Sequence, residues 1–136
     1  MALNFDRLEN ITRALKPIHQ SGRNFHATFV YNKSKLICIA HNDYTKIHPY
    51  HKFGHYKSKY DDAEYAPGIH SECSALIKMG LEDCSDLTFV NIRIDNRDRA
   101  AVSKPCVNCQ GILNQVGFKR IWFFDGNKYL KYSKEL

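Results

Sequence analysis

The sequence predicts an α/β protein in which a five-stranded mixed sheet carries helices on both faces. Segments with helical and with strand periodicity follow one another in the order helix, two strands, helix, strand, helix, two strands. Strand–helix–strand units need right-handed crossovers, which place the helices over the faces of the sheet. Only Gly126 and Asn127 separate the last two predicted strands. We therefore expect these two strands to pair antiparallel.

The length and composition suit a single globular domain covering residues 1–136. A chain of 136 residues can bury close to ~70% of the surface that its unfolded form exposes, so it can fold without disulfide bonds. Hydrophobic residues make up 43% and charged residues 25% of the chain, which excludes a fibrous or disordered protein. The formal net charge of +6 favours an anionic partner, either a nucleotide phosphate or a polynucleotide.

The first half of the chain begins with a helix and a hairpin. Apolar residues recur at close to the helical period over residues 3–15, and Pro17 is expected to stop this helix. Two β-rich runs follow, at residues 25–31 and 35–41. The three residues between them predict a hairpin turn.

Residues 69–80 predict an amphipathic helix. Gly80 stands where a C-terminal cap belongs. The residues expected on its apolar face are Ile69, Cys73, Leu76 and Ile77.

Three strands and a helix are predicted in the remaining sequence. Residues 87–94 are predicted to form a strand, and a basic loop runs from there to Lys104. Pro105 suits the first position of a helix, which Gly117 should end. Residues 119–125 and 128–132 complete the sheet.

The sequence gives no sign of secretion or of a membrane span. The N-terminal residues carry charges where a signal peptide needs its apolar stretch, and the longest apolar run, residues 36–40, is too short to cross a bilayer. We expect a cytoplasmic protein without membrane contact. In that compartment the five cysteines should stay reduced, so a close pair is better used for metal than for a disulfide.

Cys106 and Cys109 form such a pair at the start of a predicted helix. Residues at i and i+3 share one helix face, and the helix dipole favours their thiolate forms. Two thiolates and one imidazole leave the fourth position of a tetrahedral Zn²⁺ open for water, as in a catalytic site. His70 is the candidate imidazole, because both helices begin after strands of one sheet and their N-termini can meet at one edge.

Glu72 lies two positions after His70 and is not needed as a ligand. A carboxylate beside an acidified water can take its proton and hand it to a leaving group. His70-Ser71-Glu72 followed by Pro105-Cys106-Val107-Asn108-Cys109 matches the H-x-E and P-C-x-x-C signature of zinc nucleobase deaminases. The alternative is a coincidence of a surface His–Glu pair with a redox C-x-x-C.

On these motifs and on its order of elements, the sequence resembles the cytidine deaminase-like superfamily over most of its length. The SKPCVNC form, with KRIWFFD downstream, looks most like small viral and phage members. The resemblance implies a three-layer α/β/α fold and Zn²⁺ held by His70, Cys106 and Cys109. It also implies that Glu72 moves protons while water attacks C4 of cytosine.

The same resemblance implies four substrate contacts. The main-chain N–H of Ser71 would donate to the base carbonyl, and the main chain at Ser103 and Lys104 would accept from the amino group. Asn42 matches an asparagine that contacts the sugar hydroxyl, although a turn residue is the alternative. The Phe-x-x-Glu-Asn ribose motif of small cytidine deaminases is absent from the sequence, which argues against a free nucleoside.

Residues 46–60 form a long loop that combines four lysines, three histidines and three tyrosines with no acid. This composition suits a nucleotide phosphate or the stacked bases of a single strand. A solvated loop and a second zinc site at its three histidines, as in deoxycytidylate deaminases, are the alternatives. The candidate phosphate or nucleic-acid contacts are Lys46, His48, Tyr50, His51, Lys52, His55, Lys57 and Lys59.

Three functions follow from this reading. The first is a zinc-dependent hydrolase of cyclic amidines that converts the cytosine of a nucleotide or nucleoside, dCMP-like, to uracil and ammonia. The second is a cytosine deaminase of single-stranded DNA or RNA. The third is a non-catalytic nucleic-acid-binding module that keeps zinc, which the presence of Glu72 disfavours. Self-association through the helices is expected by resemblance.

Overall fold

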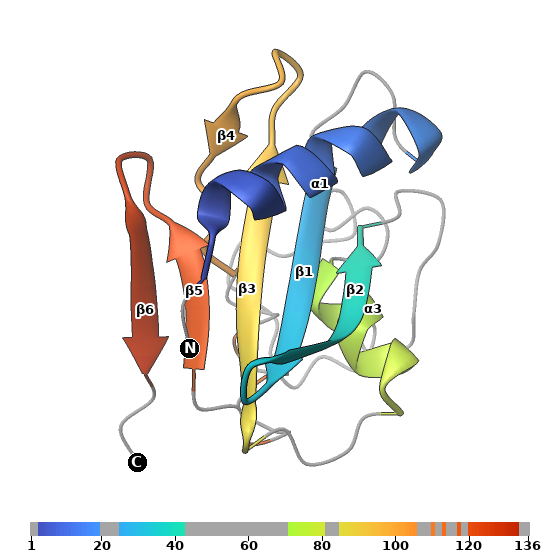
Figure 1. Cartoon of the computed structure of the whole chain (residues 1–136), viewed down its shortest axis with the longest axis vertical. Helices are drawn as coiled ribbons and strands as arrows, with labels where there is room; N and C mark the ends of the chain where they lie inside the picture. The colour runs from blue at the N-terminus through green and yellow to red at the C-terminus, as the bar shows by residue number, and fades with distance from the viewer. Residues whose placement is uncertain are drawn as a thin grey trace, which may run out of the picture.

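The central feature of the fold is a mixed sheet in which the strands follow the order β2-β1-β3-β5-β6, while β4 pairs with β3 outside this path (Figure 1). The computed structural model describes residues 3–19, 25–42, 71–80, 85–105, 110, 113, 117 and 120–133. The strands are β1 Phe25–Asn32, β2 Lys35–His41, β3 Leu87–Ile94, β4 Ala100–Ala101, β5 Arg120–Phe124 and β6 Tyr129–Ser133.

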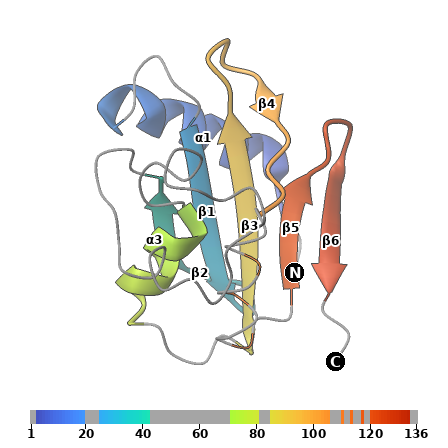
Figure 2. The ribbon, with the colours of Figure 1, turned by 180° about the vertical axis from the view of Figure 1, so that it is seen from behind.

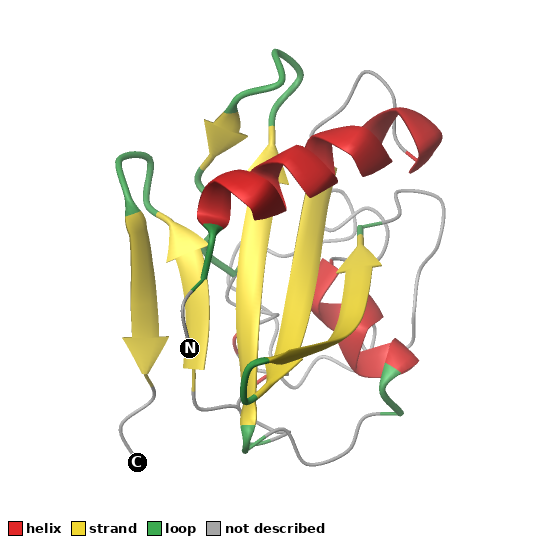
Figure 3. Ribbon diagram, in the orientation of Figure 1, coloured by secondary structure: helices red, strands yellow, loops and turns green. Residues whose placement is uncertain are grey.

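Helices lie on both faces of this sheet. Helix α1, Phe5–His19, crosses the face seen in Figure 1, and α3, Ser71–Lys78, lies on the face seen in Figure 2. Strand β1 is antiparallel to both β2 and β3, and β3 is parallel to β5. Strands β5 and β6 are antiparallel, as predicted. The predicted five-stranded α/β architecture is therefore confirmed, with β4 as an addition (Figure 3).

A separate hydrophobic core fills each face. Successive side chains of a strand point to opposite faces, so β1 contributes Phe29 to one core and Val30 to the other. The core beneath α1 contains Leu8, Phe25, Ala27, Phe29, Val90, Ile92 and Ile94. The core beneath α3 contains Val30, Ala40, Ala75, Leu76, Phe89, Leu113 and Ile121.

Aromatic and polar contacts join helix α1 to β6, the strand at one edge of the sheet. The rings of Phe5 and Tyr129 stack with centroids 4.1 Å apart. The Tyr129 hydroxyl donates to Glu9 Oε2 at 2.7 Å. The first residues of α1 are thereby held against β6.

The expectation that Pro17 stops the first helix is wrong, because α1 continues to His19. Pro17 lies in the last turn, so the helix loses only the one hydrogen bond that its missing N–H would have made. A tertiary contact holds the same turn in place. The buried Lys16 donates from Nζ to the main-chain oxygen of Asp95 at 2.6 Å.

The predicted basic loop after residue 94 contains the two-residue strand β4. Asp95 organises the turn before it, since its Oδ1 accepts hydrogen bonds from the N–H groups of Arg97 and Arg99 at 2.8 and 3.0 Å. Two alanines give no alternating pattern, so the sequence offered no signal for this strand.

The second predicted helix, at residues 69–80, is described from Ser71 onward. Leu76 is buried as expected, Ala75 is buried as well, and Ile77 is only partly buried. Ile69 and the side chain of Cys73 lie outside what the structure describes. Gly80 has a φ of +80°, which suits a C-terminal cap without a side chain. Its N–H donates to the oxygen of Ile77 at 3.1 Å.

Of the helix predicted after Pro105, the structure describes Gln110 and Leu113 as helical and Gly117 with a φ of +78°. The long predicted loop at residues 46–60 lies outside the described residues. No helix in the described part of the chain is both long and apolar enough to span a bilayer.

Candidate functional site

The start of α3 is buried against the middle of the sheet. Ser71 and Glu72, its first two residues, are 1% and 4% exposed. A carboxylate is costly to bury unless polar groups surround it. Ser71 supplies one of them, because its Oγ donates to Glu72 Oε1 at 2.9 Å. The first turn of the helix therefore holds the side chain that the sequence predicts to be the general acid and base.

The sheet contributes two polar side chains to this site. Thr28 of β1 and Asn91 of β3 are register partners. Thr28 Oγ1 lies 2.8 Å from Ser71 Oγ and 2.7 Å from Asn91 Oδ1. The threonine hydroxyl has one hydrogen, so it donates to one of these oxygens at a time. Close polar contacts thus run from Asn91 through Thr28 and Ser71 to Glu72, and the two hydroxyl hydrogens serve two of these three contacts at a time.

Asn91 also holds the segment that precedes the second motif. Its Nδ2 donates to the main-chain oxygen of Ser103 at 3.2 Å, and Ser103 Oγ donates to the main-chain oxygen of Asn91 at 2.8 Å. Ser103 is only 1% exposed. Because a carbonyl oxygen has two lone pairs, the contact with Asn91 leaves one for a further donor.

Strand β5 fixes Ser103 from the other side. The N–H of Ser103 donates to the oxygen of Phe124 at 3.0 Å, and the N–H of Phe124 donates to Ser103 Oγ at 2.8 Å. Ser103 is therefore bonded to β3 and β5 together. This position holds the chain two residues before Pro105, where the second motif begins.

Asn42 completes the end of the β1–β2 ladder. Its N–H donates to the oxygen of His26 at 3.1 Å, and its Oδ1 accepts from the N–H of His26 at 3.0 Å. The side chain is 7% exposed. The side-chain oxygen thus has a structural partner, as expected for a residue that ends a strand.

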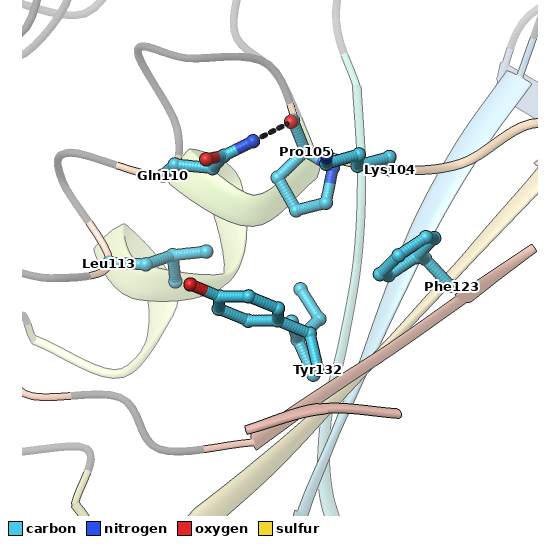
Figure 4. A pocket seen from close by; sticks show the side chains of 7 residues that line it. Lys104, Pro105, Gln110, Leu113, Phe123 and Tyr132 are labelled. Atoms are coloured by element: carbon cyan, nitrogen blue, oxygen red, sulfur yellow. Dashed lines mark hydrogen bonds between the residues drawn. The ribbon is translucent and has the colours of Figure 1, made fainter. Parts of the chain in front are cut away.

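Lys104 is exposed and borders a cavity of about 160 Å³ between β5, β6 and the segment after Pro105 (Figure 4). Gln110 Nε2 donates to the oxygen of Pro105 at 2.7 Å across one side of it. Ligand pockets usually measure roughly 300–1,000 Å³. Neither Ser71 nor Glu72 lines this cavity, so it is separate from the polar chain described above.

The structure brings three of the predicted site residues into one hydrogen-bonded system, namely Ser71, Glu72 and Ser103. The two residues that join them, Thr28 and Asn91, were missed in the sequence analysis. The available signal for both was a polar residue within a mostly apolar strand. Apart from Asn42 and Lys104, described above, the other predicted site residues lie outside the described part of the chain: His70, Cys106, Cys109, Lys46, His48, Tyr50, His51, Lys52, His55, Lys57 and Lys59.

Within the described ranges, no group of three histidine, cysteine or acidic side chains could hold a metal ion. Two of the predicted zinc ligands directly adjoin described residues in the sequence. His70 directly precedes Ser71, and Cys106 directly follows Pro105. The hydrogen-bonded chain from Ser71 to Ser103 holds the two segments on one face of the sheet. One imidazole and two thiolates are a donor set that suits zinc.

The sheet order and the helix on each face define a cytidine deaminase-like fold. The structure is similar to that of cytidine deaminase from Mycobacterium leprae, with a TM-score of 0.53 and 16% identity over 96% of this chain and 94% of that chain. It also matches dCMP deaminase from the cyanophage S-TIM5 in apo form, with a TM-score of 0.49 and 13% identity over 89% and 82% of the two chains. The fold assignment rests on the likeness to the mycobacterial enzyme.

No protein-family model matches the sequence, and a search of curated proteins gives no match. The structural likeness confirms the fold predicted from the two motifs.

Proposed function

We propose that this chain is a zinc-dependent hydrolytic deaminase that converts the cytosine of a nucleotide or nucleoside, dCMP-like, to uracil with release of ammonia. The observation that carries the proposal is the buried Glu72 carboxylate at the start of α3, connected through hydrogen bonds to Ser103 before the P-C-x-x-C motif. The deaminase fold of the chain agrees with it.

Zinc would be held by His70, Cys106 and Cys109. When bound, it supplies a water whose pKa is lowered to about 7. Glu72 would accept a proton from the attacking water and deliver protons to the ring nitrogen N3 and to the amino group. The bond between C4 and the exocyclic amino nitrogen then breaks and ammonia leaves. The oxygen of the water becomes the new carbonyl oxygen of uracil.

The burial of Glu72 supports this role. In a site shielded from water, the free energy of the carboxylate depends on the few hydrogen bonds that it receives. The surrounding protein groups therefore set the free energy at which such a carboxyl gains or loses a proton. A general acid and base requires this control. A surface glutamate would give no such control.

The main chain around Ser103 would orient the base. Ser103 is fixed by β3 and β5, and its carbonyl oxygen has a lone pair beyond the one used by Asn91. An amino group of the substrate could donate to it or to the neighbouring carbonyl of Lys104. The main-chain N–H of Ser71, in the first turn of α3, would donate to the base carbonyl.

A second candidate, deamination of cytosine in single-stranded nucleic acid, is favoured by the composition of residues 46–60 and the net charge of +6. The two candidates share their chemistry and differ in what surrounds the base. A polynucleotide substrate would contact several phosphates, so its binding would weaken steeply with salt.

The experiment is a parallel incubation of the zinc-loaded protein with dCMP, deoxycytidine and a cytosine-bearing oligonucleotide, with uracil measured in each. Uracil from dCMP or deoxycytidine would support the first candidate, and uracil from the oligonucleotide alone would support the second. If the protein binds zinc but forms uracil from none of them, it is a binding module.

A further inference from the structure

Thr28 and Asn91 are an unusual pair for the centre of a sheet. Both face α3 and are buried, with exposed fractions of 0% and 2%. The next pair in the same register, Val30 and Phe89, is fully apolar. A buried hydroxyl and a buried amide destabilise a protein unless their hydrogen bonds are made.

The hydrogen bonds of this pair lead to both motif segments. On one side, Thr28 contacts Ser71, which donates to Glu72. On the other side, Asn91 donates to the oxygen of Ser103. The side chains of two strands thus connect the start of α3 to the segment before Pro105.

The amide orientation of Asn91 follows from its partners. Its Nδ2 must face the Ser103 oxygen at 3.2 Å, because the reverse orientation would set two oxygens against each other. Its Oδ1 therefore faces Thr28 and can only accept. Thr28 therefore donates to Asn91, and the Ser71 hydroxyl can donate either to Thr28 Oγ1 or to Glu72 Oε1, so that Ser71 links the strand pair to the carboxylate.

We infer that Thr28 and Asn91 are positioning residues that set the Glu72 carboxylate relative to the Ser103 main chain. The inference rests on the proposed function, in which Glu72 moves protons while the Ser103 segment holds the base. In this role both residues act through their contacts with Ser71 and Ser103. Outer hydrogen-bond partners in metal sites typically change activity about 10–100-fold when they are replaced, and we expect the same range here.

A purely structural role makes a different prediction. When both partners of a buried hydrogen bond are replaced by apolar side chains of similar shape, stability is often unchanged. A Thr28→Val/Asn91→Leu double variant would then be as active as the wild type. If the pair positions Glu72, the double variant stays folded but loses activity.

The test compares Thr28→Val, Thr28→Ser and the double variant with Thr12→Val. Thr12 is an equally buried threonine in α1, on the opposite face of the sheet, and its Oγ1 donates only to the oxygen of Leu8 at 2.7 Å among the described residues. It therefore controls for the loss of one buried hydroxyl. Each protein is assayed for kcat and KM with the cytosine substrate. The ¹³C resonance of the Glu72 carboxyl carbon is recorded at one fixed pH.

We expect kcat to fall about 10–100-fold in Thr28→Val and in the double variant, with a smaller change in KM. Thr28→Ser should restore kcat, and the Glu72 resonance should shift in the two impaired variants only. Thr12→Val should change neither. The double variant keeps the test decisive if Thr28→Val alone fails to fold, since the Asn91 oxygen that Thr28→Val leaves without its donor is then absent as well.

Wild-type kcat and an unmoved Glu72 resonance in the double variant would overturn the inference. If the wild type deaminates no cytosine substrate, the proposed function fails, and the carboxyl resonance still decides whether the pair positions Glu72. A shift in Thr28→Val that Thr28→Ser reverses supports positioning in that case, and an unmoved resonance overturns it.

Discussion

Thr28 Oγ1 and Asn91 Oδ1 lie 2.7 Å apart on neighbouring antiparallel strands, both buried beneath the start of α3. The relationship connects residues 63 positions apart in the chain. Through Ser71 and Ser103 it also connects the segments that carry the two motifs. Polar side chains of the central strands β1 and β3 therefore contact both segments of the candidate site, namely the start of α3 and the segment before Pro105.

Zinc content tests the predicted ligands separately from activity. The purified wild type should contain about one zinc per chain, and Cys109→Ser should lose it, because a site with two ligands binds zinc far more weakly than one with three. Cys38→Ala is the control. Cys38 lies in β2, where burial raises the pKa of its thiol. Metal analysis that finds full zinc in Cys109→Ser would contradict the ligand assignment.

The core beneath α3 should dominate the stability of the site. Leu76 is fully buried, so Leu76→Ala should lower the free energy of unfolding by about 2–5 kcal/mol. Ile18→Ala, at a side chain that is 73% exposed, should change it by no more than about 0.5 kcal/mol. Urea titrations followed by circular dichroism measure both values. Equal losses in the two variants would show that α3 does not pack as described.

Asp95 should make the protein sensitive to acid. Hydrogen bonds from the main chain, first from Arg99 and then from Arg97, hold the pKa of the Asp95 carboxyl below its ordinary value of 3.8. A carboxyl whose pKa is lower in the folded state stabilises the protein above the unfolded-state pKa. This stabilisation is lost as the pH falls through the folded-state value. The sensitive range therefore begins near pH 4 and extends downward.

Unfolding midpoints measured between pH 6 and pH 2.5 check this expectation. Asp95→Asn should unfold more readily than the wild type at pH 6, and the difference between them should shrink toward pH 2.5. Asp86→Asn, at an exposed aspartate before β3, controls for the loss of one negative charge. A difference that stays constant over the whole range would exclude the carboxylate as its cause.

Local patterns in the sequence were sufficient to predict most of the elements. Strand β3 was predicted with the bounds that it has, because an apolar run with β-branched residues is typical of a strand buried on both faces. Gly80 and Gly126 were predicted at helix and hairpin ends, and both have a positive φ. Each of these signals is contained in a few neighbouring residues.

The features that were missed depend on contacts between distant residues. Helix α1 passes Pro17 because its last turn is held by the bond from Lys16 to Asp95, 79 positions away. Thr28 and Asn91 come together through the register of β1 and β3, and no local pattern specifies that register. The two motifs thus predict candidate site residues, whereas the contacts of Ser71 and Ser103 with Thr28 and Asn91 are visible only in the fold.

The most direct test of the central claim compares ammonia release by the zinc-loaded wild type and by Glu72→Gln. The glutamine keeps the shape of the side chain and can still accept from Ser71, but it cannot take up a proton. General acid–base catalysis contributes about 10²–10⁴-fold. We therefore predict that kcat falls by that factor while zinc content and the unfolding midpoint stay the same. Glu9→Gln, in α1 on the opposite face, should keep full activity. A Glu72→Gln protein that deaminates cytosine at the wild-type rate would contradict the claim.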